Sequence, residues 1–312
     1  MGKPQPLPSF TGEARAAVPG SEDRNGAVDI VRFLGALAIV WFHERMPYHF
    51  IAYSALPVFM GFLVYFALVT RERTSNTRIR AERLLVPWLA WSLIFGVLKI
   101  ADAAQSNAPL ASEFEVWMLL TGPKIHLWFL PAAFFAGWGL CALAPYFARS
   151  SRFWLLLTLY FLAQTGMCYV LTHYTFPYPF YQWLFVSPAC LLGVAMWAAG
   201  GSRVRLILVL AAAALSYEVT AAFVWWHGSM HGLIAAAACT LALLTPLRSN
   251  QVTSTLAGIS LGIYLAHPFV HAVLLRLPSP EPGTLSFTLA VAVISILLVL
   301  LLKRVPLARQ IV

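Results

Sequence analysis

Long apolar segments joined by short, basic connections are the feature that most limits what this chain can fold into. A helix needs roughly 20 mostly apolar residues to cross the hydrocarbon core of a bilayer, and segments of this kind recur between residues 28 and 304. Of the 312 residues, 60% are hydrophobic and only 11% are charged. A soluble domain carries about 25% charged residues, so this chain cannot hide its apolar surface in one globule and needs lipid around it.

Ten apolar segments are expected to be transmembrane helices. They cover residues 28–46, 50–70, 84–103, 126–147, 153–172, 183–199, 203–217, 230–246, 254–275 and 286–304. The stretch from Leu206 to Trp226 would also fit one long span, but Tyr217 and Glu218 favour a break there. The sequence therefore predicts an all-α integral membrane protein with about ten spans.

The distribution of basic residues predicts which helix ends face the cytoplasm. With both termini on one side, 16 of the 21 lysines and arginines fall in the tails and connections of that side. Basic residues accumulate on the cytoplasmic side of membrane proteins, so both termini are expected to be cytoplasmic. The net charge of +9 follows from this topology, and charges confined to short loops between helices do not indicate nucleic-acid binding.

Three regions divide the chain. Residues 1–25 are polar and rich in Pro, Gly and Ser, so we expect a disordered cytoplasmic tail. Residues 26–305 are expected to form the transmembrane domain and residues 306–312 a short cytoplasmic tail, so we expect no appended soluble catalytic domain. The four cysteines lie in apolar segments without C-x-x-C spacing, so we expect small core residues rather than disulfides or metal ligands.

Ionisable residues are concentrated in the first span, where charge is costly and usually faces the bundle interior. Arg32 and His43 are 11 positions apart, which places them about 20° from alignment on one helix face and roughly 16 Å apart along the axis. Because histidine can act as a base near neutral pH, this pair would suit catalysis. Alternatively, Asp29 and Arg32 form an interfacial ion pair and His43 lies near the outer surface. Glu44 points about 100° away from His43 and is not expected to orient it.

A second concentration of charge precedes the third span. Residues 70–87 contain five arginines. Arg80 and Arg83, three positions apart, are neighbours on a helix, and their guanidinium groups could hold a polyphosphate through bidentate hydrogen bonds. The alternative is a basic anchor that contacts lipid headgroups.

Five motifs resemble those of the acyltransferase-3 family, in the same order and with similar spacing. They are DIVRFLGALAIVWFH at residues 29–43, PVFMGFLVY at 57–65, RIRAERLLVPW at 78–88, HLWFL at 126–130 and SLGIYLAHP at 260–268. The second motif departs from the family pattern at Met60, where serine is usual. The resemblance covers about residues 28–305.

This resemblance implies a membrane enzyme that passes an acyl group from cytoplasmic acyl-CoA to a hydroxyl group outside. Acetyl-CoA is the expected donor and no metal is expected. The acceptor would be a glycan or a lipid-linked sugar, or else a small hydroxylated product such as an antibiotic. The implied location is the cytoplasmic (inner) membrane of a bacterium, in contact with its lipids.

The resemblance also implies roles for individual residues. His43 matches the essential histidine, as general base or acyl carrier, and Arg32 matches the essential arginine. The donor-side arginines correspond to Arg80 and Arg83. Four further motif residues take either a pocket role or a packing role, and Asp29 is expected to support Arg32; the four are His126, Trp128, Tyr264 and His267.

Two other classes of protein share some of these features. A small-molecule transporter would also have ten spans and charges within the membrane, but it typically shows internal repeats, and none is evident in this sequence. A non-catalytic scaffold would not need Arg32 and His43 on one face. The aromatic connection at residues 172–183 should lie outside, as an interfacial belt or as a stacking platform for a sugar.

Overall fold

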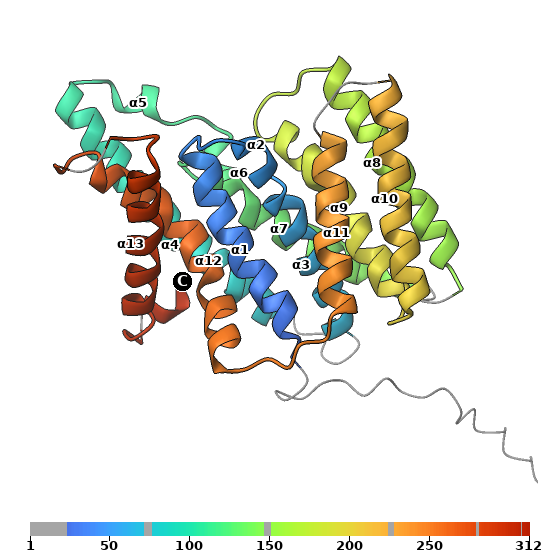
Figure 1. Cartoon of the computed structure of the whole chain (residues 1–312). Coiled ribbons are helices and arrows are strands. Elements are labelled where there is room, and N and C mark those ends of the chain that lie inside the picture. The colour runs from blue at the N-terminus through green and yellow to red at the C-terminus, as the bar shows by residue number, and fades with distance from the viewer. Residues whose placement is uncertain (1–23, 72–76, 147–150, 224–227, 279–280, 307) are drawn as a thin grey trace, which may run out of the picture.

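The structure, a computed structural model, describes residues 24–71, 77–146, 151–223, 228–278, 281–306 and 308–312. Side chains at positions 71, 77–80 and 223 lie outside that description. Within the described ranges, the regular elements are helices, with one isolated β-bridge between Asn25 and Arg248. The helices form one bundle (Figure 1).

Nine segments of the described chain are long and apolar enough to cross a membrane. Seven of them coincide with or lie within single helices, namely α1 (Gly26–His43), α4 (Thr77–Ser106), α8 (Phe153–His173), α9 (Phe180–Ala198), α10 (Arg203–Phe223), α12 (Gln251–Leu274) and α13 (Leu285–Leu302). The other two combine consecutive elements, α2 (His49–Ala52) with α3 (Ala55–Arg71), and η2 (Ile125–Trp128) with α7 (Phe129–Leu143) and η3 (Ala144–Tyr146). A tenth apolar helix, α11 (Gly228–Leu244), is slightly shorter. Short helices α5 (Leu110–Glu113), α6 (Met118–Thr121) and η4 (Ala308–Gln310) complete the described elements.

The all-α, multi-pass fold is thus confirmed, whereas the expected break near residue 217 is wrong. Helix α10 runs without interruption through Tyr217 and Glu218 to Phe223. Neither residue type breaks a helix. Next to them, the hydroxyl of Ser216 pairs with that of Thr165 on α8 at 3.0 Å, so this part of α10 is held within the bundle.

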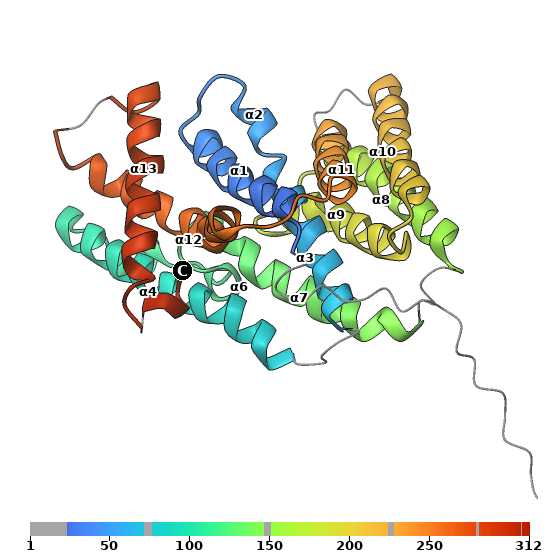
Figure 2. The ribbon, with the colours of Figure 1, turned by 60° about the horizontal axis from the view of Figure 1, so that its bottom comes forward.

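Both ends of the described chain lie on the same side of the bundle. The backbone N–H of Ser249, just before α12, donates to the Arg24 carbonyl at 3.0 Å, just before α1. At the end of α13, the Lys303 ammonium donates to the Gly258 carbonyl at 2.8 Å. We call this the basic side, because the arginine-rich helix ends gather here, and the opposite side the distal side. Helices α1 and α12 start together and run side by side in both views (Figures 1 and 2).

The bundle is arranged around α3. Helices α4 and α13 lie at one edge and α8 and α10 at the other, with α1, α3 and α7 between them (Figures 1 and 2). Helix α3 packs most extensively on α9, and also contacts α1, α7 and α11. Residues of α3 therefore face neighbours on most sides.

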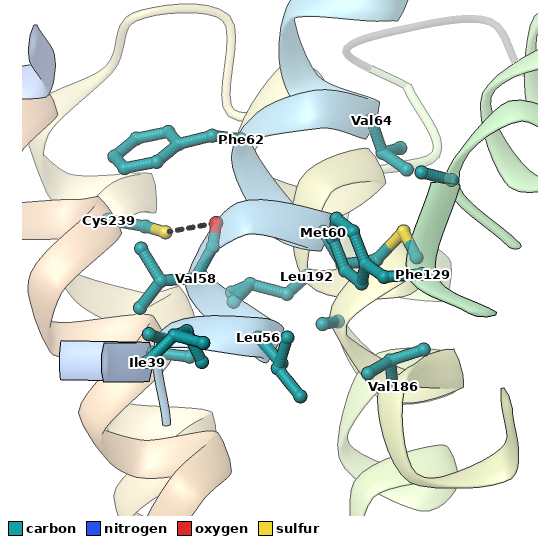
Figure 3. Packing of buried hydrophobic residues seen from close by; sticks show 14 of the residues in the cluster. Ile39, Leu56, Val58, Met60, Phe62, Val64, Phe129, Val186, Leu192 and Cys239 are labelled. Carbon is teal, nitrogen blue, oxygen red and sulfur yellow. Dashed lines mark hydrogen bonds between the residues drawn. The ribbon is translucent and has the colours of Figure 1, made fainter. Parts of the chain in front are cut away.

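Core packing around α3 explains Met60 and the cysteines. The Met60 side chain is fully buried and lies close to Phe129 of α7 (Figure 3), so it acts as core filler where the family pattern has serine. Cys239 of α11 contacts the Val58 carbonyl at 3.8 Å (Figure 3). None of the four cysteines forms a disulfide, and three of them are buried, as expected for small core residues.

Helix α3 approaches α9 so closely that only glycine fits at position 193. A Cβ there would lie 2.6 Å from the Gly61 carbonyl oxygen and 2.8 Å from the Val64 Cβ. We expect Gly193→Ala to push the two helices apart and to lower the free energy of unfolding by about 1–3 kcal/mol. The midpoint of thermal unfolding of the protein in detergent would measure this.

A matched control is Gly166→Ala in α8, where an added Cβ meets no atom within 4 Å. Alanine favours a helix over glycine by about 1 kcal/mol, so this variant should unfold at the wild-type temperature or above it. Equal unfolding midpoints for the two variants would contradict the close approach of α3 and α9.

Candidate active site

A cleft of about 380 Å³ opens between α1, α3, α4, α7 and α12. Arg32 of α1 and Arg83 of α4 line it, and among the described residues that form its wall there is no carboxylate. Phenylalanine and leucine side chains supply most of the remaining lining. At the basic side the cleft reaches Thr70, at the end of α3, and deeper in the bundle it reaches Tyr264 of α12. The cleft is therefore cationic and otherwise largely apolar.

Three histidines from distant parts of the chain meet beyond this cleft, and we call them the histidine group: His43, His126 and His267. The ring of His267 lies 5.0 Å from that of His43 and 5.8 Å from that of His126, measured between centroids. His126 and His267 are buried, whereas His43 is exposed at the last residue of α1. The group thus combines one accessible imidazole with two enclosed ones.

Tyr264 connects the cleft with the histidine group. It lines the cleft, and its ring centroid lies 5.9 Å from His126 and 6.2 Å from His267. The Tyr264 hydroxyl donates a hydrogen bond to the backbone carbonyl of His126. On α12, positions 260, 264 and 267 lie on one face because residues three and four apart are helix neighbours. One face of α12 therefore carries both the cleft wall and a histidine.

A hydrogen-bonded side-chain pair that the sequence did not reveal joins the end of α1 to α12 next to this group. Glu44 follows His43, is 3% exposed, and its Oε1 lies 2.8 Å from Nδ1 of His271. His271 is four positions after His267 and so shares its helix face, which is the one signal in the sequence that could have suggested it. As expected, Glu44 does not orient His43; its partner is His271.

Asp29 is bound to partners other than Arg32, so the alternative of an Asp29–Arg32 ion pair is not what the structure shows. The buried Asp29 carboxylate accepts hydrogen bonds from Arg24 at 2.8 and 3.0 Å and from the Ser249 hydroxyl at 3.0 Å. Asp29 lies in the first turn of α1. From there its carboxylate reaches Arg24, just before α1, and Ser249, just before α12. Asp29 therefore secures the basic-side ends of α1 and α12, while Arg32 faces the cleft.

The remaining predicted site residues lie in different surroundings. Trp128 is buried in η2, with its ring against Phe129, so it packs beneath the cleft wall. Arg83 is exposed at the cleft. Arg80 belongs to the first turn of α4, but its side chain lies outside the described part of the structure.

The aromatic connection between α8 and α9 packs onto the segment that carries His126. The Tyr178 hydroxyl donates to the Ile125 carbonyl at 2.8 Å, and the Trp117 ring meets the Tyr178 ring edge-on at 4.3 Å. Burial raises the pKa of Tyr178 to about 12, so its hydroxyl stays protonated as a donor at neutral pH. Tyr174 and Phe176 of the same connection are exposed.

Within the described ranges, no three His, Cys, Asp or Glu side chains are arranged to hold a metal ion. The histidine group is instead a set of nitrogen bases and donors. Arg32 and Arg83 supply positive charge along the path that leads to it.

Many apolar helices around an interior site define an integral, multi-pass membrane protein. The family described as acyltransferase domain, acyltransferase-3, matches residues 25–304. Because this match covers nearly the whole chain, the protein belongs to that family and is a membrane acyltransferase. Among curated proteins and among solved structures, none matches the chain significantly.

Removing the Asp29 carboxylate is expected to destabilise the bundle. In Asp29→Ala, Arg24 and Ser249 lose a buried acceptor, which should lower the free energy of unfolding by about 1–3 kcal/mol. Asp102→Ala is the matched control, because its 2.8 Å ion pair with Arg276 is exposed on both partners and should contribute only about 0–1 kcal/mol. Thermal unfolding in detergent measures both, and a smaller effect for Asp29→Ala than for Asp102→Ala would contradict the structural role.

Proposed function

We propose that this membrane acyltransferase takes its acyl group from acyl-CoA bound at the basic side and transfers it to a hydroxyl group at the distal side. One observation carries the proposal: a cleft lined by Arg32 and Arg83 extends to Tyr264, which adjoins the histidine group. Acetyl-CoA is the proposed donor, so the reaction would be O-acetylation.

The chemistry of the cleft supports an acyl-CoA donor. Coenzyme A carries several phosphate charges at one end and its thioester at the other, joined by a long flexible arm. Arg83 is placed to bind phosphates where the cleft meets the basic side, and Arg80 precedes it by one helix turn. Arginine holds phosphate through paired hydrogen bonds. The apolar walls suit the arm and the acyl chain, because ligand sites are largely apolar with few charged groups.

His43 is the proposed catalytic residue. It lies 11 positions after Arg32 on one continuous helix, hence roughly 16 Å further along the axis, a depth that the extended arm of the donor spans. In the proposed reaction the neutral imidazole takes the proton from the acceptor hydroxyl as its oxygen attacks the thioester carbonyl. A route through an acyl-histidine intermediate uses the same residue. Arg32 would steer the donor or stabilise the negative charge that develops on the carbonyl oxygen.

The acceptor is proposed to be a glycan or a lipid-linked sugar that reaches His43 from the distal side. His43 is exposed there, and the aromatic connection around Tyr178 lies beside His126. Aromatic faces are suitable platforms for sugar rings. A small hydroxylated product is the second acceptor class, and the proposed location is the inner membrane of a bacterium. The transporter alternative loses its support, because the chain belongs to an acyltransferase family.

The direct test uses purified protein in lipid, radiolabelled acetyl-CoA and a glycan-rich membrane extract. Wild type should transfer label to a glycan, and His43→Ala, folded by size-exclusion chromatography, should lose about a hundred-fold or more of the rate. Equal rates for the two proteins would show that His43 is not catalytic. Absence of both transfer and acetyl-CoA binding in wild type would contradict the proposed donor.

The proposed phosphate contact predicts a selective effect of Arg83→Ala. Losing one charge-assisted contact of about 1.5–3 kcal/mol should raise the KM for acetyl-CoA by about ten-fold or more, with little change in kcat or in the KM for the acceptor. Steady-state kinetics over both substrates would measure this.

Arg203→Ala provides the control for surface charge. Arg203 is also exposed, at the start of α10 on the basic side, but it does not line the cleft. The KM of the Arg203→Ala variant for acetyl-CoA should remain that of wild type. Equal increases for Arg83→Ala and Arg203→Ala would mean that general surface charge, and not the cleft, attracts the donor.

A further inference from the structure

His267 carries a ring nitrogen without a partner at the point where the histidine group meets the proposed catalytic residue. Its Nδ1 lies 3.2 Å from the Ile263 carbonyl oxygen. A carbonyl oxygen only accepts, so Nδ1 carries the hydrogen, and in the neutral ring Nε2 keeps its lone pair. Nε2 is buried and makes no hydrogen bond, and the whole residue is 1% exposed.

A buried ring nitrogen of this kind destabilises the fold unless it gains a hydrogen-bond partner. Leaving a buried polar atom without a hydrogen bond is destabilising, and each such atom needs an explanation, of which a catalytic role is one. The nearest ring outside α12 is that of His43, with centroids 5.0 Å apart and planes inclined by 39°. The His43 ring is exposed and adjoins the buried His267 ring, which makes it the candidate donor to Nε2.

The two buried carboxylates of the described chain, those of Glu44 and Asp29, are bound to partners other than His43. Glu44 is next in sequence, but it is bound to His271 at 2.8 Å. Asp29 lies at the other end of α1, bound to Arg24 and Ser249. A histidine base needs a second group that fixes its tautomer and stabilises its charged form, a role usually filled by a carboxylate.

We propose that His267 is the positioning residue of the acyl transfer, with its Nε2 accepting a hydrogen bond from the N–H of His43. This inference rests on the proposed function. The hydrogen bond between His43 and His267 leaves the other His43 nitrogen with a lone pair for the acceptor hydroxyl. As the acceptor oxygen bonds to the thioester carbon, its proton moves to that nitrogen. The carbon–sulfur bond then breaks, and the CoA thiolate takes the proton from His43 to leave as the thiol.

The local structure holds His267 in this orientation. Pro268 follows it within α12 and has no N–H to offer the Tyr264 carbonyl, so the helix turn that faces the His267 ring is one hydrogen bond short. The His126 ring packs on the other side of the His267 ring, with the two centroids 5.8 Å apart. The imidazole is therefore enclosed with its Nδ1 side toward its own helix, which leaves Nε2 for a partner outside the helix.

A matched pair of variants separates a hydrogen-bond role from a packing role. His267→Gln keeps an acceptor oxygen at about the reach of Nε2, whereas His267→Leu fills similar space without one. We expect kcat for acetyl transfer in His267→Leu to be at least about ten-fold below that in His267→Gln, with similar KM for acetyl-CoA and similar thermal unfolding. Equal kcat values in the two variants would overturn the proposal.

A second readout does not depend on activity. In protein labelled with ¹⁵N-histidine, the Nε2 resonance of His267 should show an accepted hydrogen bond in wild type and move toward that of a free lone pair in His43→Ala. An unchanged Nε2 resonance of His267 in His43→Ala would refute the His43–His267 hydrogen bond. A wild type that shows this change but transfers no acyl group would contradict the proposed function and leave the His43–His267 hydrogen bond standing.

Discussion

The parallel packing of α1 on α12 is the constraint on which the site depends. The two helices are joined at the basic side through Asp29, which binds Arg24 and Ser249, and at the distal side through the pair of Glu44 with His271. Both carboxylates are buried, and each is matched by hydrogen-bond donors, which is the condition for tolerating charge away from water. With both ends fixed, the residues of α1 between them are held in one register against α12.

That register brings the cleft and the histidine group into line for the proposed reaction. Arg32 faces the cleft that Ser260 and Tyr264 line on α12, and His43 meets His267 further along. In the proposed reaction the donor and the acceptor approach from opposite sides, since His43 is exposed at the distal end of α1 while the cleft reaches Thr70 and Arg83 on the basic side. The close approach of α3 and α9 through Gly193 keeps the wall opposite α12 in place.

Sequence reasoning predicted the helical, multi-pass architecture, because apolar length and charge asymmetry depend on local composition. It also placed Arg32 and His43 on one face, since a single helix fixes their spacing. It could not foresee that Asp29 binds Arg24, or that Glu44 binds His271, because these pairs depend on how helices distant in sequence pack together. The break expected at Tyr217 and Glu218 was also wrong because of packing within the bundle. Two polar residues near a helix end do not break the helix when hydroxyls beside them, such as that of Ser216, are paired within the bundle.

The most direct test of the account is to map where the acyl group of bound donor lies. An acyl-CoA with a photoreactive diazirine on its acyl chain would be irradiated with the purified protein in lipid, and the labelled peptides identified by mass spectrometry. Labels are expected in the distal end of α1 near His43 and in α12 around Tyr264 and His267. They should be removed by excess acetyl-CoA and lost when Arg32 and Arg83 are both replaced by alanine. Labels confined to lipid-facing positions of α13, unaffected by acetyl-CoA, would contradict this expectation.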